Sequence, residues 1–440
     1  MPRRSHARIS SLIVFSFMLL ATSLSKPAPA QSLGPYDRDS ARAMLNMVRD
    51  DLKGNYYDQT FHGLNLEERF KDGEARIKTA TTRDQLMIVV AQSLLELNDS
   101  HTFFVPPARA ARIEYGWQLR MVKDECFVSA VKPQSDAEAK GLKPGDLVLS
   151  VDGAQPTRGI FWKMLYRYYA LMPSRTVRMI VRSPGDSGPR QIEVLSKIQE
   201  SPSVTNWGDL FIRYLSEEWD LNHDRFFEVG NEMLIWKMPT FEVSKDHVDA
   251  IMGKARKFNT LVIDLRGNGG GYVDTLSRLV SHFFDKEIKI ADLKSRKEMK
   301  PQLAKKRSGE PFSGRLIVLV DSNSASASEL FARVMQIEKR GTVLGDATAG
   351  AVMTAKYYDH QSGVGRILYF GASVTIADMI MTDGKSLEHV GVVPDEMVLP
   401  TGADLAAGRD PVLARAAEIA GVKLMPEKAG SLFPVEWKRQ

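Results

Sequence analysis

The sequence predicts a multidomain α/β protein with a helical N-terminal region, a small β-rich domain and a larger layered domain. Its 440 residues, of which 43% are hydrophobic, are enough for two or three cores. The hydrophobic pattern changes from helical spacing to short strands near residue 109, and near residue 201 to aliphatic strands that alternate with amphipathic helices. We therefore divide the chain into segments 1–30, 31–108, 109–200, 201–400 and 401–440.

The first thirty residues are typical of a signal peptide. Arginines at positions 3, 4 and 8 precede an apolar run over 9–24, and Ala28-Pro29-Ala30 fits the small-residue rule for cleavage. This predicts an exported, periplasmic or secreted protein whose mature chain starts at Gln31. The alternative is an uncleaved membrane anchor, but the apolar run is shorter than the ~20 residues that a spanning helix needs.

Composition limits the classes of partner. Removal of the first thirty residues takes away four basic and no acidic residues, which lowers the net charge from +5 to +1. The basic pI is therefore no sign of nucleic-acid binding. Cys126 is the single cysteine, so neither an intramolecular disulfide nor a cysteine zinc cluster can form, and its apolar neighbours predict a buried, inert thiol. The histidines at positions 62, 223, 247, 282 and 360 are scattered and lack the spacing of metal ligands. We therefore expect no metal and no cofactor.

Residues 37–97 predict a small helical cap. Ala41, Met44, Leu45, Val48 and Leu52 share one face of a helix, and a second helix from residue 86 to residue 97 follows a Thr82…Gln85 capping box. The pattern ends at Asn98-Asp99-Ser100-His101, where a Ser-His pair precedes two phenylalanines.

Residues 112–199 resemble a PDZ domain. The resemblance lies in the run from Ala137 to Gly153, where glycines and a proline turn the chain before an apolar strand and Asp152-Gly153 makes a tight turn after it. PDZ domains bind an extended C-terminal peptide as an added strand. The resemblance implies a carboxylate-binding loop, which departs from the usual small-residue pattern at its third position and comprises Tyr115, Gly116, Trp117, Gln118 and Leu119.

Two turns in the largest segment carry the chemistry. The aliphatic strand 316–320 runs into Asp321 to Glu329, a serine-rich turn that starts a helix whose apolar residues continue to position 337. Unpaired N–H groups at such a helix start stabilise negative charge on a substrate oxygen, so a serine here is placed for acyl transfer. Ser324, Ser326 and Ser328 are equally eligible, and each could instead cap the helix.

The other turn is rich in glycine. It follows the strand 260–263, extends from Asp264 to Tyr272 and opens a helix at Val273. Glycines permit a close approach of backbone N–H groups. A phosphate loop is disfavoured because no Gly-Lys-Ser/Thr follows. An ion pair between Asp264 and Arg266 is expected to hold the loop.

Taken together, Asp-Leu-Arg-x-Asn-Gly-Gly-Gly, Ser-Ala-Ser-Ala-Ser-Glu and Gly-Val-Val-Pro-Asp, placed after a PDZ-like domain, resemble the carboxyl-terminal processing and tricorn-core family of serine peptidases. The resemblance covers nearly the whole mature chain. It implies a ClpP/crotonase-like layered catalytic domain over 201–400 and a PDZ domain over 109–200. It also implies Ser326 as the nucleophile, with the N–H groups of Ala327 and of Gly270, or of Gly269, as the oxyanion hole.

The general base has to be chosen between the two versions of this family. Members with a Ser-Lys dyad carry a lysine where this chain has Ala351, so only a substitute such as Lys356 could serve. The tricorn-like version implies His101 as the base, oriented by Ser100, which Glu388 holds in turn. The stretch around Glu388 matches the family except that a histidine, residue 389, replaces a glycine.

We therefore expect an exported serine endopeptidase that recruits substrates by their C-terminal tails. The lost lysine also allows a catalytically silent binding protein, as in the retinoid-binding relatives of the family, whereas the intact Ser-His pair and Glu388 oppose that alternative. A predicted amphipathic helix from residue 406 to residue 421 could pack on the core or on a second subunit of a homo-oligomer.

Overall fold

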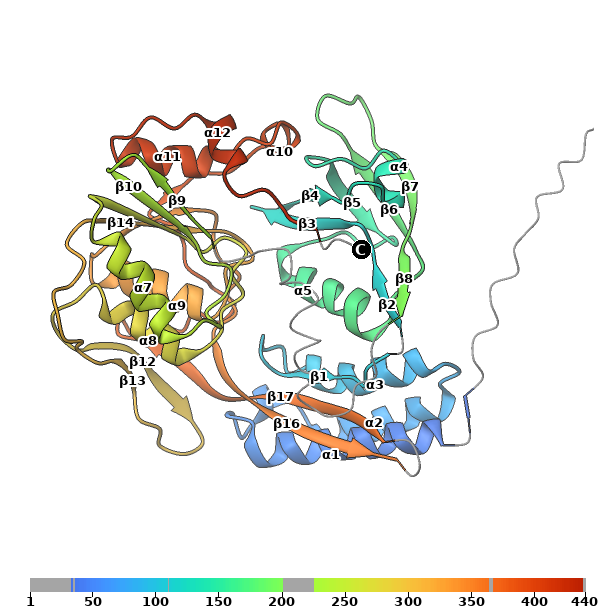
Figure 1. Cartoon of the computed structure of the whole chain (residues 1–440). Helices are drawn as coiled ribbons and strands as arrows, with labels where there is room; N and C mark the ends of the chain where they lie inside the picture. The colour runs from blue at the N-terminus through green and yellow to red at the C-terminus, as the bar shows by residue number, and fades with distance from the viewer. Residues whose placement is uncertain (1–32, 35, 110, 201–224, 364–366, 438–440) are drawn as a thin grey trace, which may run out of the picture.

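The computed structural model describes residues 33–34, 36–109, 111–200, 225–363 and 367–437. Figure 1 shows three parts around a common centre: N-terminal helices with long strands below, a small β domain at the upper right and a layered α/β part at the left. The predicted signal segment with its cleavage after Ala30, and His223, lie outside the described residues. Within the described ranges, no helix combines the length and apolarity needed to cross a membrane.

The N-terminal part is the predicted helical cap. The apolar face expected from residue 41 to residue 52 is buried, and the Thr82–Gln85 capping box is present at the start of the third helix, so both predictions are confirmed. The helices are α1 (Asp37–Asn55), η1 (Phe61–Gly63), α2 (Leu66–Thr79) and α3 (Arg83–Leu95).

These helices pack against a five-stranded sheet whose central strand, β17 (Leu368–Met381), comes from the distant C-terminal half. β17 pairs antiparallel with three neighbours, and one register places Phe103 opposite Ser373. The segment that follows Ser100-His101 is therefore held against the C-terminal half of the chain. The other strands are β1 (Phe103–Val105), β12 (Ile288–Ser295), β13 (Gln302–Ala304) and β16 (Met353–Ser362).

The small β domain is a five-stranded antiparallel sheet in the order β3-β4-β5-β6-β7, which leaves β3 at an edge. Asp152 and Gly153 both have positive φ, 48° and 83°, which confirms the predicted tight turn. Its elements are β3 (Trp117–Val122), β4 (Glu125–Val131), α4 (Asp136–Ala139), β5 (Leu147–Val151), α5 (Arg158–Tyr166), η2 (Arg167–Leu171), β6 (Thr176–Arg182) and β7 (Arg190–Leu195). A separate ribbon, β2 (Ala111–Glu114) with β8 (Lys197–Glu200), connects it to its neighbours.

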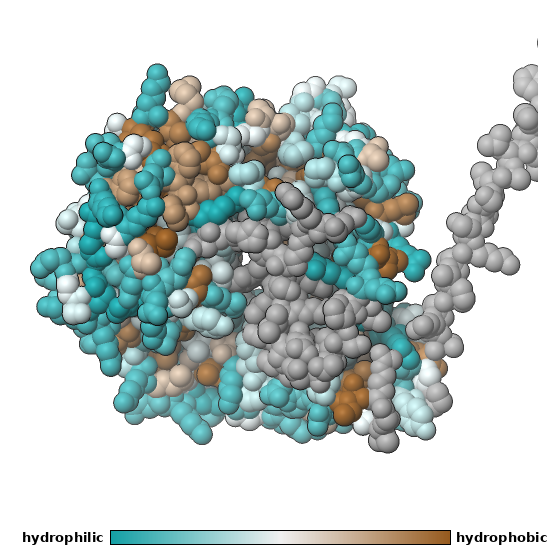
Figure 2. Space-filling model, in the orientation of Figure 1, coloured by the Kyte–Doolittle hydropathy of each residue, from teal (hydrophilic) through white to brown (hydrophobic). Residues whose placement is uncertain are grey.

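The layered part is built on a six-stranded sheet in the order β18-β15-β14-β11-β10-β9, parallel except for β9. Helices α7, α8 and α9 cover one face, and α11 and α12 cover the other. Figure 2 shows apolar side chains at the surface over the β9–β10 edge and the C-terminal helices. The elements are β9 (Arg225–Val229), β10 (Met233–Lys237), α7 (Lys245–Ala255), β11 (Thr260–Asp264), α8 (Val273–Ser281), β14 (Arg315–Val320), α9 (Ala327–Ile337), β15 (Thr342–Gly345), β18 (Glu396–Met397) and α12 (Pro426–Ser431).

The predicted single helix over 406–421 is wrong. The structure has two helices, α10 (Gly402–Ala406) and α11 (Pro411–Ile419). Gly408 has a φ of 63°, which ends the first helix, and Pro411 starts the second because its missing N–H and fixed φ suit a first helical position. The Asp410 side chain caps α11 by accepting a hydrogen bond from the N–H of Leu413 at 3.0 Å.

Candidate active site

Ser326 lies on a strained turn between β14 and α9. Its φ and ψ of 55° and −116° are rare for a residue with a side chain, and such strain collects at functional sites. Its N–H donates to Ala351 O at 2.9 Å and to Glu329 Oε2 at 3.0 Å. These two bonds fix the backbone at Ser326. The residue is half-buried at the start of α9, where the helix dipole is positive.

The two neighbouring serines have structural roles. Ser324 and Ser328 are fully buried. The Ser324 hydroxyl donates to Leu265 O at 2.8 Å, and the Ser328 hydroxyl donates to Asn268 O at 2.9 Å. Both side chains therefore tie the serine turn to the glycine-rich turn, which leaves Ser326 as the eligible nucleophile of the three.

Glu329 is a supporting residue that the sequence reasoning missed. Its carboxylate is fully buried and accepts hydrogen bonds from Thr348 Oγ1 at 2.6 Å and from the N–H groups of Gly350 and Ala351 at 2.8 and 2.9 Å, besides that of Ser326. Burial raises its pKa to about 7, against the lowering effect of these donors. The signal in the sequence was a glutamate three residues after a serine, the spacing of a capping box.

The glycine-rich turn packs directly against Ser326. A Cβ built on Gly270 would lie 2.7 Å from the Ser326 Cβ and 3.2 Å from the Ala327 nitrogen. The Gly270 N–H donates to Asn268 Oδ1 at 2.8 Å, so it would have to leave or share that bond to serve a substrate. The N–H groups of Gly269 and Ala327 donate to no described residue, and Gly269 lines the adjoining cavity.

Ser100, His101 and Glu388 are joined by hydrogen bonds. Ser100 Oγ lies 2.7 Å from His101 Nδ1 and 2.9 Å from Glu388 Oε2, and Ser100 N–H donates to Glu388 Oε1 at 2.7 Å. An ionised carboxylate only accepts, so the single hydroxyl proton of Ser100 goes to Glu388. Ser100 must then accept from Nδ1–H, which leaves Nε2 of the neutral imidazole without a proton and able to take one.

Glu388 also binds the residue just before β16, close to Ser326 in the structure. Its Oε2 accepts from Val352 N–H at 2.8 Å. The next residue, His389, has a φ of 62°, so it adopts the left-handed conformation that the family's glycine would favour, with its side chain 56% exposed. The replacement is therefore accommodated without disturbing the bonds of Glu388.

Ser326 and the hydrogen-bonded group of Ser100, His101 and Glu388 both contact residues 351–352. Ser326 N–H binds the carbonyl of Ala351, and the next residue, Val352, binds Glu388. Within the described ranges, no hydrogen bond joins the Ser326 hydroxyl to the His101 imidazole. In unliganded enzymes such bonds are often long and tighten only when substrate binds.

The surroundings of His101 keep it neutral. Burial lowers the pKa of its imidazole below the ordinary 6.5, and the charges of Glu388 and Asp99 oppose that lowering in part. Lys356 is placed differently: it is exposed on β16, with its ammonium 5.3 Å from the ring centre of Tyr358, a residue that packs on the helical cap.

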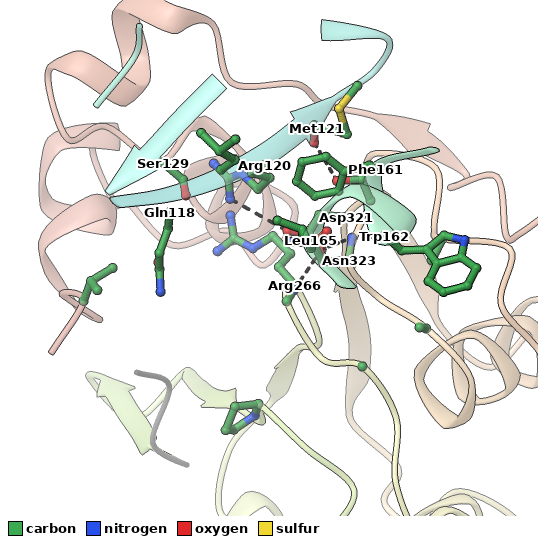
Figure 3. A pocket seen from close by; sticks show the side chains of 18 of the residues that line it. Gln118, Arg120, Met121, Ser129, Phe161, Trp162, Leu165, Arg266, Asp321 and Asn323 are labelled. Carbon is green, nitrogen blue, oxygen red and sulfur yellow. Dashed lines mark hydrogen bonds and ion pairs between the residues drawn. The ribbon is translucent and has the colours of Figure 1, made fainter. Parts of the chain in front are cut away.

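A cavity of about 990 Å³ adjoins the serine turn. Figure 3 shows Gln118 and Arg120 of β3 and Phe161 of α5 on one side, with Asp321 of the serine turn facing them. The same cavity is lined by Gly269.

The predicted carboxylate-binding loop is only partly a loop. Trp117, Gln118 and Leu119 belong to β3, where alternation buries Trp117 and Leu119 in the domain core and turns Gln118 outward. Tyr115 is also buried and donates its hydroxyl to a backbone carbonyl of the same domain, that of residue 168. Gly116, with a φ of 74°, forms the turn before the strand.

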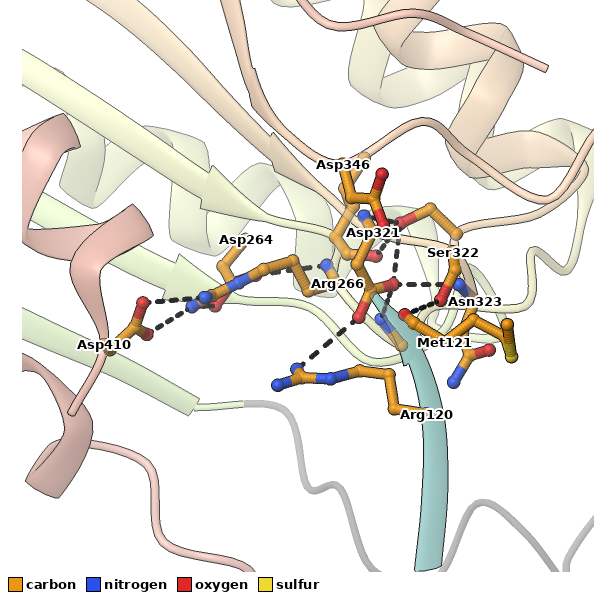
Figure 4. A network of polar contacts seen from close by, with 12 residues as sticks. Arg120, Met121, Asp264, Arg266, Asp321, Ser322, Asn323, Asp346 and Asp410 are labelled. Atoms are coloured by element: carbon orange, nitrogen blue, oxygen red, sulfur yellow. Dashed lines mark hydrogen bonds and ion pairs between the residues drawn. The ribbon is translucent and has the colours of Figure 1, made fainter. Parts of the chain in front are cut away.

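Polar contacts join the small β domain to the serine turn (Figure 4). Ser322 Oγ donates to Met121 O of β3 at 2.6 Å, and the guanidinium of Arg120 lies 3.8 Å from Asp321. Beside them, Arg266 pairs with Asp264 and Asp410 at 2.8 and 2.7 Å. The predicted ion pair at the end of β11 is therefore confirmed, and it extends to the C-terminal segment.

The chain is similar to known proteins in two of its parts. Residues 233–398 match the model for peptidase family S41, and residues 108–160 match the model for the PDZ domain. Similar curated proteins include the chloroplastic C-terminal processing peptidase of Tetradesmus obliquus, 25% identical and covering 79% of this chain and 75% of its own. Another is the carboxy-terminal processing protease CtpA of Bacillus subtilis (strain 168), 22% identical with 81% and 68% covered.

Solved structures show the same fold. Mature CPAF in complex with lactacystin superposes with a TM-score of 0.63 at 14% identity, covering 84% of this chain and 95% of its own. The photosystem II D1 C-terminal processing protease gives a TM-score of 0.52 at 18% identity, with 88% and 99% covered. The predicted α/β fold with a layered catalytic domain, helical cap and PDZ domain is confirmed.

The fold and the matched regions define a serine-type peptidase with an internal PDZ domain. More particularly, residues 233–398 match the model for peptidase family S41, and the chain is similar to proteins named C-terminal processing peptidases.

Proposed function

We propose that this chain is an exported serine endopeptidase that cleaves proteins recruited by their C-terminal tails, with Ser326 as nucleophile and His101 as general base. The observation that carries the proposal is the hydrogen-bonded series Glu388, Ser100 and His101, which joins residues 288 positions apart and leaves Nε2 of the imidazole as a proton acceptor. Hydrogen-bonded titratable side chains gathered in a buried polar site are typical of acid–base chemistry, which supports a functional role for this series.

The reaction follows the acyl-enzyme route. Ser326 Oγ attacks the scissile carbonyl carbon while its proton passes to His101 Nε2, and the imidazolium then gives that proton to the leaving amine. A water molecule, deprotonated by the same nitrogen, releases the acyl group from Ser326. Throughout both steps, Ser100 and Glu388 hold the imidazole in the tautomer that accepts at Nε2.

The oxyanion that forms in each step needs two donors. The N–H of Ala327 supplies one, at the positive end of α9. A glycine amide of the facing turn supplies the other. Gly270 packs against Ser326, although its N–H already donates to Asn268. Gly269 is the alternative, because its N–H donates to no described residue.

The substrate tail would add to the edge of β3. An extended peptide can pair with an edge strand and place side chains between that strand and α5, the binding mode of PDZ domains. Gly116 before β3 and the outward side chain of Gln118 both line the cavity that leads toward the serine turn. The names of the relatives, which refer to C-terminal processing, support this substrate class. The proposal that the protein is exported rests on the signal-peptide pattern of residues 1–30.

The test is mass-spectrometric detection of cleavage products from unfolded protein and peptide mixtures. The chain from Gln31 is compared with Ser326→Ala, His101→Ala and Lys356→Ala at neutral to mildly alkaline pH. We expect no products from Ser326→Ala, a loss of at least about a thousandfold for His101→Ala, and activity close to wild type for Lys356→Ala.

Other patterns would each point elsewhere. Full activity of His101→Ala together with an inert Ser326→Ala would show that the base is misassigned. An inert Lys356→Ala would favour the Ser-Lys alternative. Absence of products from every chain, wild type included, would favour a catalytically silent binding protein.

A further inference from the structure

Asp99 lies directly before the Ser100–His101 pair and is almost fully buried, with 4% of its surface exposed. Its Oδ1 accepts hydrogen bonds from the backbone N–H groups of His101 at 2.9 Å and of Thr102 at 2.6 Å. The carboxylate therefore fixes the backbone at His101 and at the residue that follows it. A rotation of this turn would move the imidazole away from its partners.

The same oxygen ties the turn to the central strand β17. Thr375 of β17 donates its hydroxyl to Asp99 Oδ1 at 2.7 Å, and Thr102 Oγ1 both donates to Thr375 Oγ1 at 3.1 Å and accepts from the Thr375 N–H at 3.0 Å. β17 also holds His101 itself, because the Ser373 hydroxyl donates to the His101 carbonyl at 2.5 Å. The position of His101 is thus set by a strand from the other end of the chain.

The second oxygen of Asp99 is different. Oδ2 is buried, and no donor among the described residues meets it in ordinary hydrogen-bond geometry. The Tyr56 hydroxyl interacts with the Asp99 carboxylate, and after burial this interaction contributes to the raised pKa of Tyr56. A buried carboxylate with so little hydrogen bonding to one oxygen is destabilising unless a positive charge lies near it. The negative charge of a carboxylate in such a place is stabilised by a positively charged partner. An imidazole that becomes protonated during catalysis is such a partner at that stage of the reaction.

Among the described residues around His101, few groups could offset the negative charge of Asp99. The titratable and charged groups that face this region are Glu388 on the loop after β17, Asp378 on β17, Tyr56 and Tyr57 after α1, His389, and Tyr357 on β16. Burial raises the pKa of each of the three tyrosines, so they stay neutral at physiological pH. His62 shares a hydrogen bond of 2.9 Å with the Tyr56 hydroxyl and lies on the outer side of this group.

We propose that Asp99 is a positioning residue for the peptidase reaction, one that holds the His101 backbone in place and whose negative charge stabilises the imidazolium formed when His101 takes the Ser326 proton. The inference rests on the proposed function, since it needs His101 to be the base. Asp99 contacts neither substrate nor the reacting atoms and acts through His101. Glu388 stabilises the same imidazolium by way of Ser100, and Asp99 adds a second negative charge from the backbone side.

The experiment compares Asp99→Asn with wild type in kcat, KM and the pH dependence of kcat/KM. Asparagine keeps an oxygen for the three donors and removes the charge. We expect kcat to fall about 10- to 100-fold with KM unchanged, and the acid limb of the profile to move to lower pH, because loss of a nearby negative charge lowers the pKa of an imidazole. NMR titration of His101 in the inactive Ser326→Ala background, with and without Asp99→Asn, should show the same direction.

The matched control is Asp58→Asn. Asp58 is a carboxylate in the same neighbourhood, but its bonds go to Thr60 and His62 and none reaches His101. We expect its kcat and pH profile to match wild type. Should Asp99→Asn fail to fold, Thr375→Val removes one donor from Oδ1 and keeps the charge. It should then lower kcat several-fold without moving the acid limb, and an unchanged kcat would overturn the positioning role.

The outcomes separate the two proposals. If His101→Ala is inactive but Asp99→Asn leaves both kcat and the pH profile at wild-type values, the inference about Asp99 is wrong and the proposed function stands. A lower kcat with an unmoved acid limb and an unmoved NMR titration would mean that Asp99 is only structural. Full activity of His101→Ala would remove the proposed function itself.

Discussion

The substitution Gly270→Ala tests the contact between the glycine-rich turn and Ser326, the proposed nucleophile. Gly270 has a φ of 105°, and its added Cβ would lie 2.7 Å from the Ser326 Cβ, 3.1 Å from the Ala325 carbonyl oxygen and 3.2 Å from the Ala327 nitrogen. Carbon atoms in contact normally lie about 3.5–4.0 Å apart, so the two turns would have to separate by roughly 1 Å. None of the three atoms belongs to a flexible side-chain end that could move aside.

The expected cost has two parts. An alanine at this φ costs about 1–3 kcal/mol, and overpacking against fixed atoms adds about 1–3 kcal/mol. The control is Gly185→Ala in the turn between β6 and β7, where φ is 88° and a Cβ would meet nothing within 4 Å. It should show the first part of the cost without the second.

The assay pairs thermal unfolding with steady-state cleavage of a peptide substrate. Gly185→Ala should lower Tm by a few degrees, at roughly 2–4 °C for each kcal/mol, and keep wild-type kcat/KM. Gly270→Ala should lower Tm by about twice as much and kcat by at least about a hundredfold, because a displacement of 1 Å at reacting atoms has that order of effect. Wild-type turnover in Gly270→Ala, with a Tm like that of the control, would refute the reasoning.

Three further predictions follow from the same site. Glu388→Gln should lower kcat by about a hundredfold or more with little change in KM. The reason is that an amide NH₂ group is only a donor and cannot replace the oxygen that accepts from the Ser100 hydroxyl and from the Val352 N–H. Unchanged turnover would contradict this prediction. The rate should fall on acidification through an apparent pKa below 6.5, because burial lowers the pKa of His101 and its neutral form persists to lower pH; an inflection above that value would oppose the assignment. Arg158→Ala removes the hydrogen bonds of Arg158 to the carbonyls of Lys123 and Ala347 and its ion pair with Asp346. We expect the free energy of unfolding to fall by about 1–3 kcal/mol and amide hydrogen exchange at residues 346–348 to become faster. Exchange equal to that of wild type would contradict this prediction.

Local patterns in the sequence predicted several elements whose structure is decided by short-range physics. The buried face of α1, the capping box of α3 and the turn at Asp152-Gly153 follow from helical spacing, side-chain caps and the dihedral preferences of glycine and aspartate. The helix predicted over 406–421 failed for a local reason too. Gly408, with its positive φ, ends one helix, and Pro411 begins the next. The apolar spacing in the sequence continues across this break and therefore does not reveal it.

The serine turn shows where the sequence leaves alternatives open. Ser324, Ser326 and Ser328 have equal standing in a linear motif, because each could cap a helix or attack a carbonyl. Tertiary packing separates them: two are fully buried and bonded to the glycine-rich turn, and one occupies a strained backbone conformation at the start of α9.

By itself, the sequence determined many of the helices and turns, the family resemblance and the short motifs that carry serines, glycines and the Ser-His pair, since these depend on neighbours along the chain. The family resemblance implied that Glu388 holds Ser100, and the tertiary structure supplies the hydrogen bonds between these residues, 288 positions apart. Only the tertiary structure decided that Asp99 is bound by β17. The physical reason is that a hydrogen bond between distant residues depends on the packing of the strand that brings them together, and the pairing of β1 with β17 is not encoded in either segment alone.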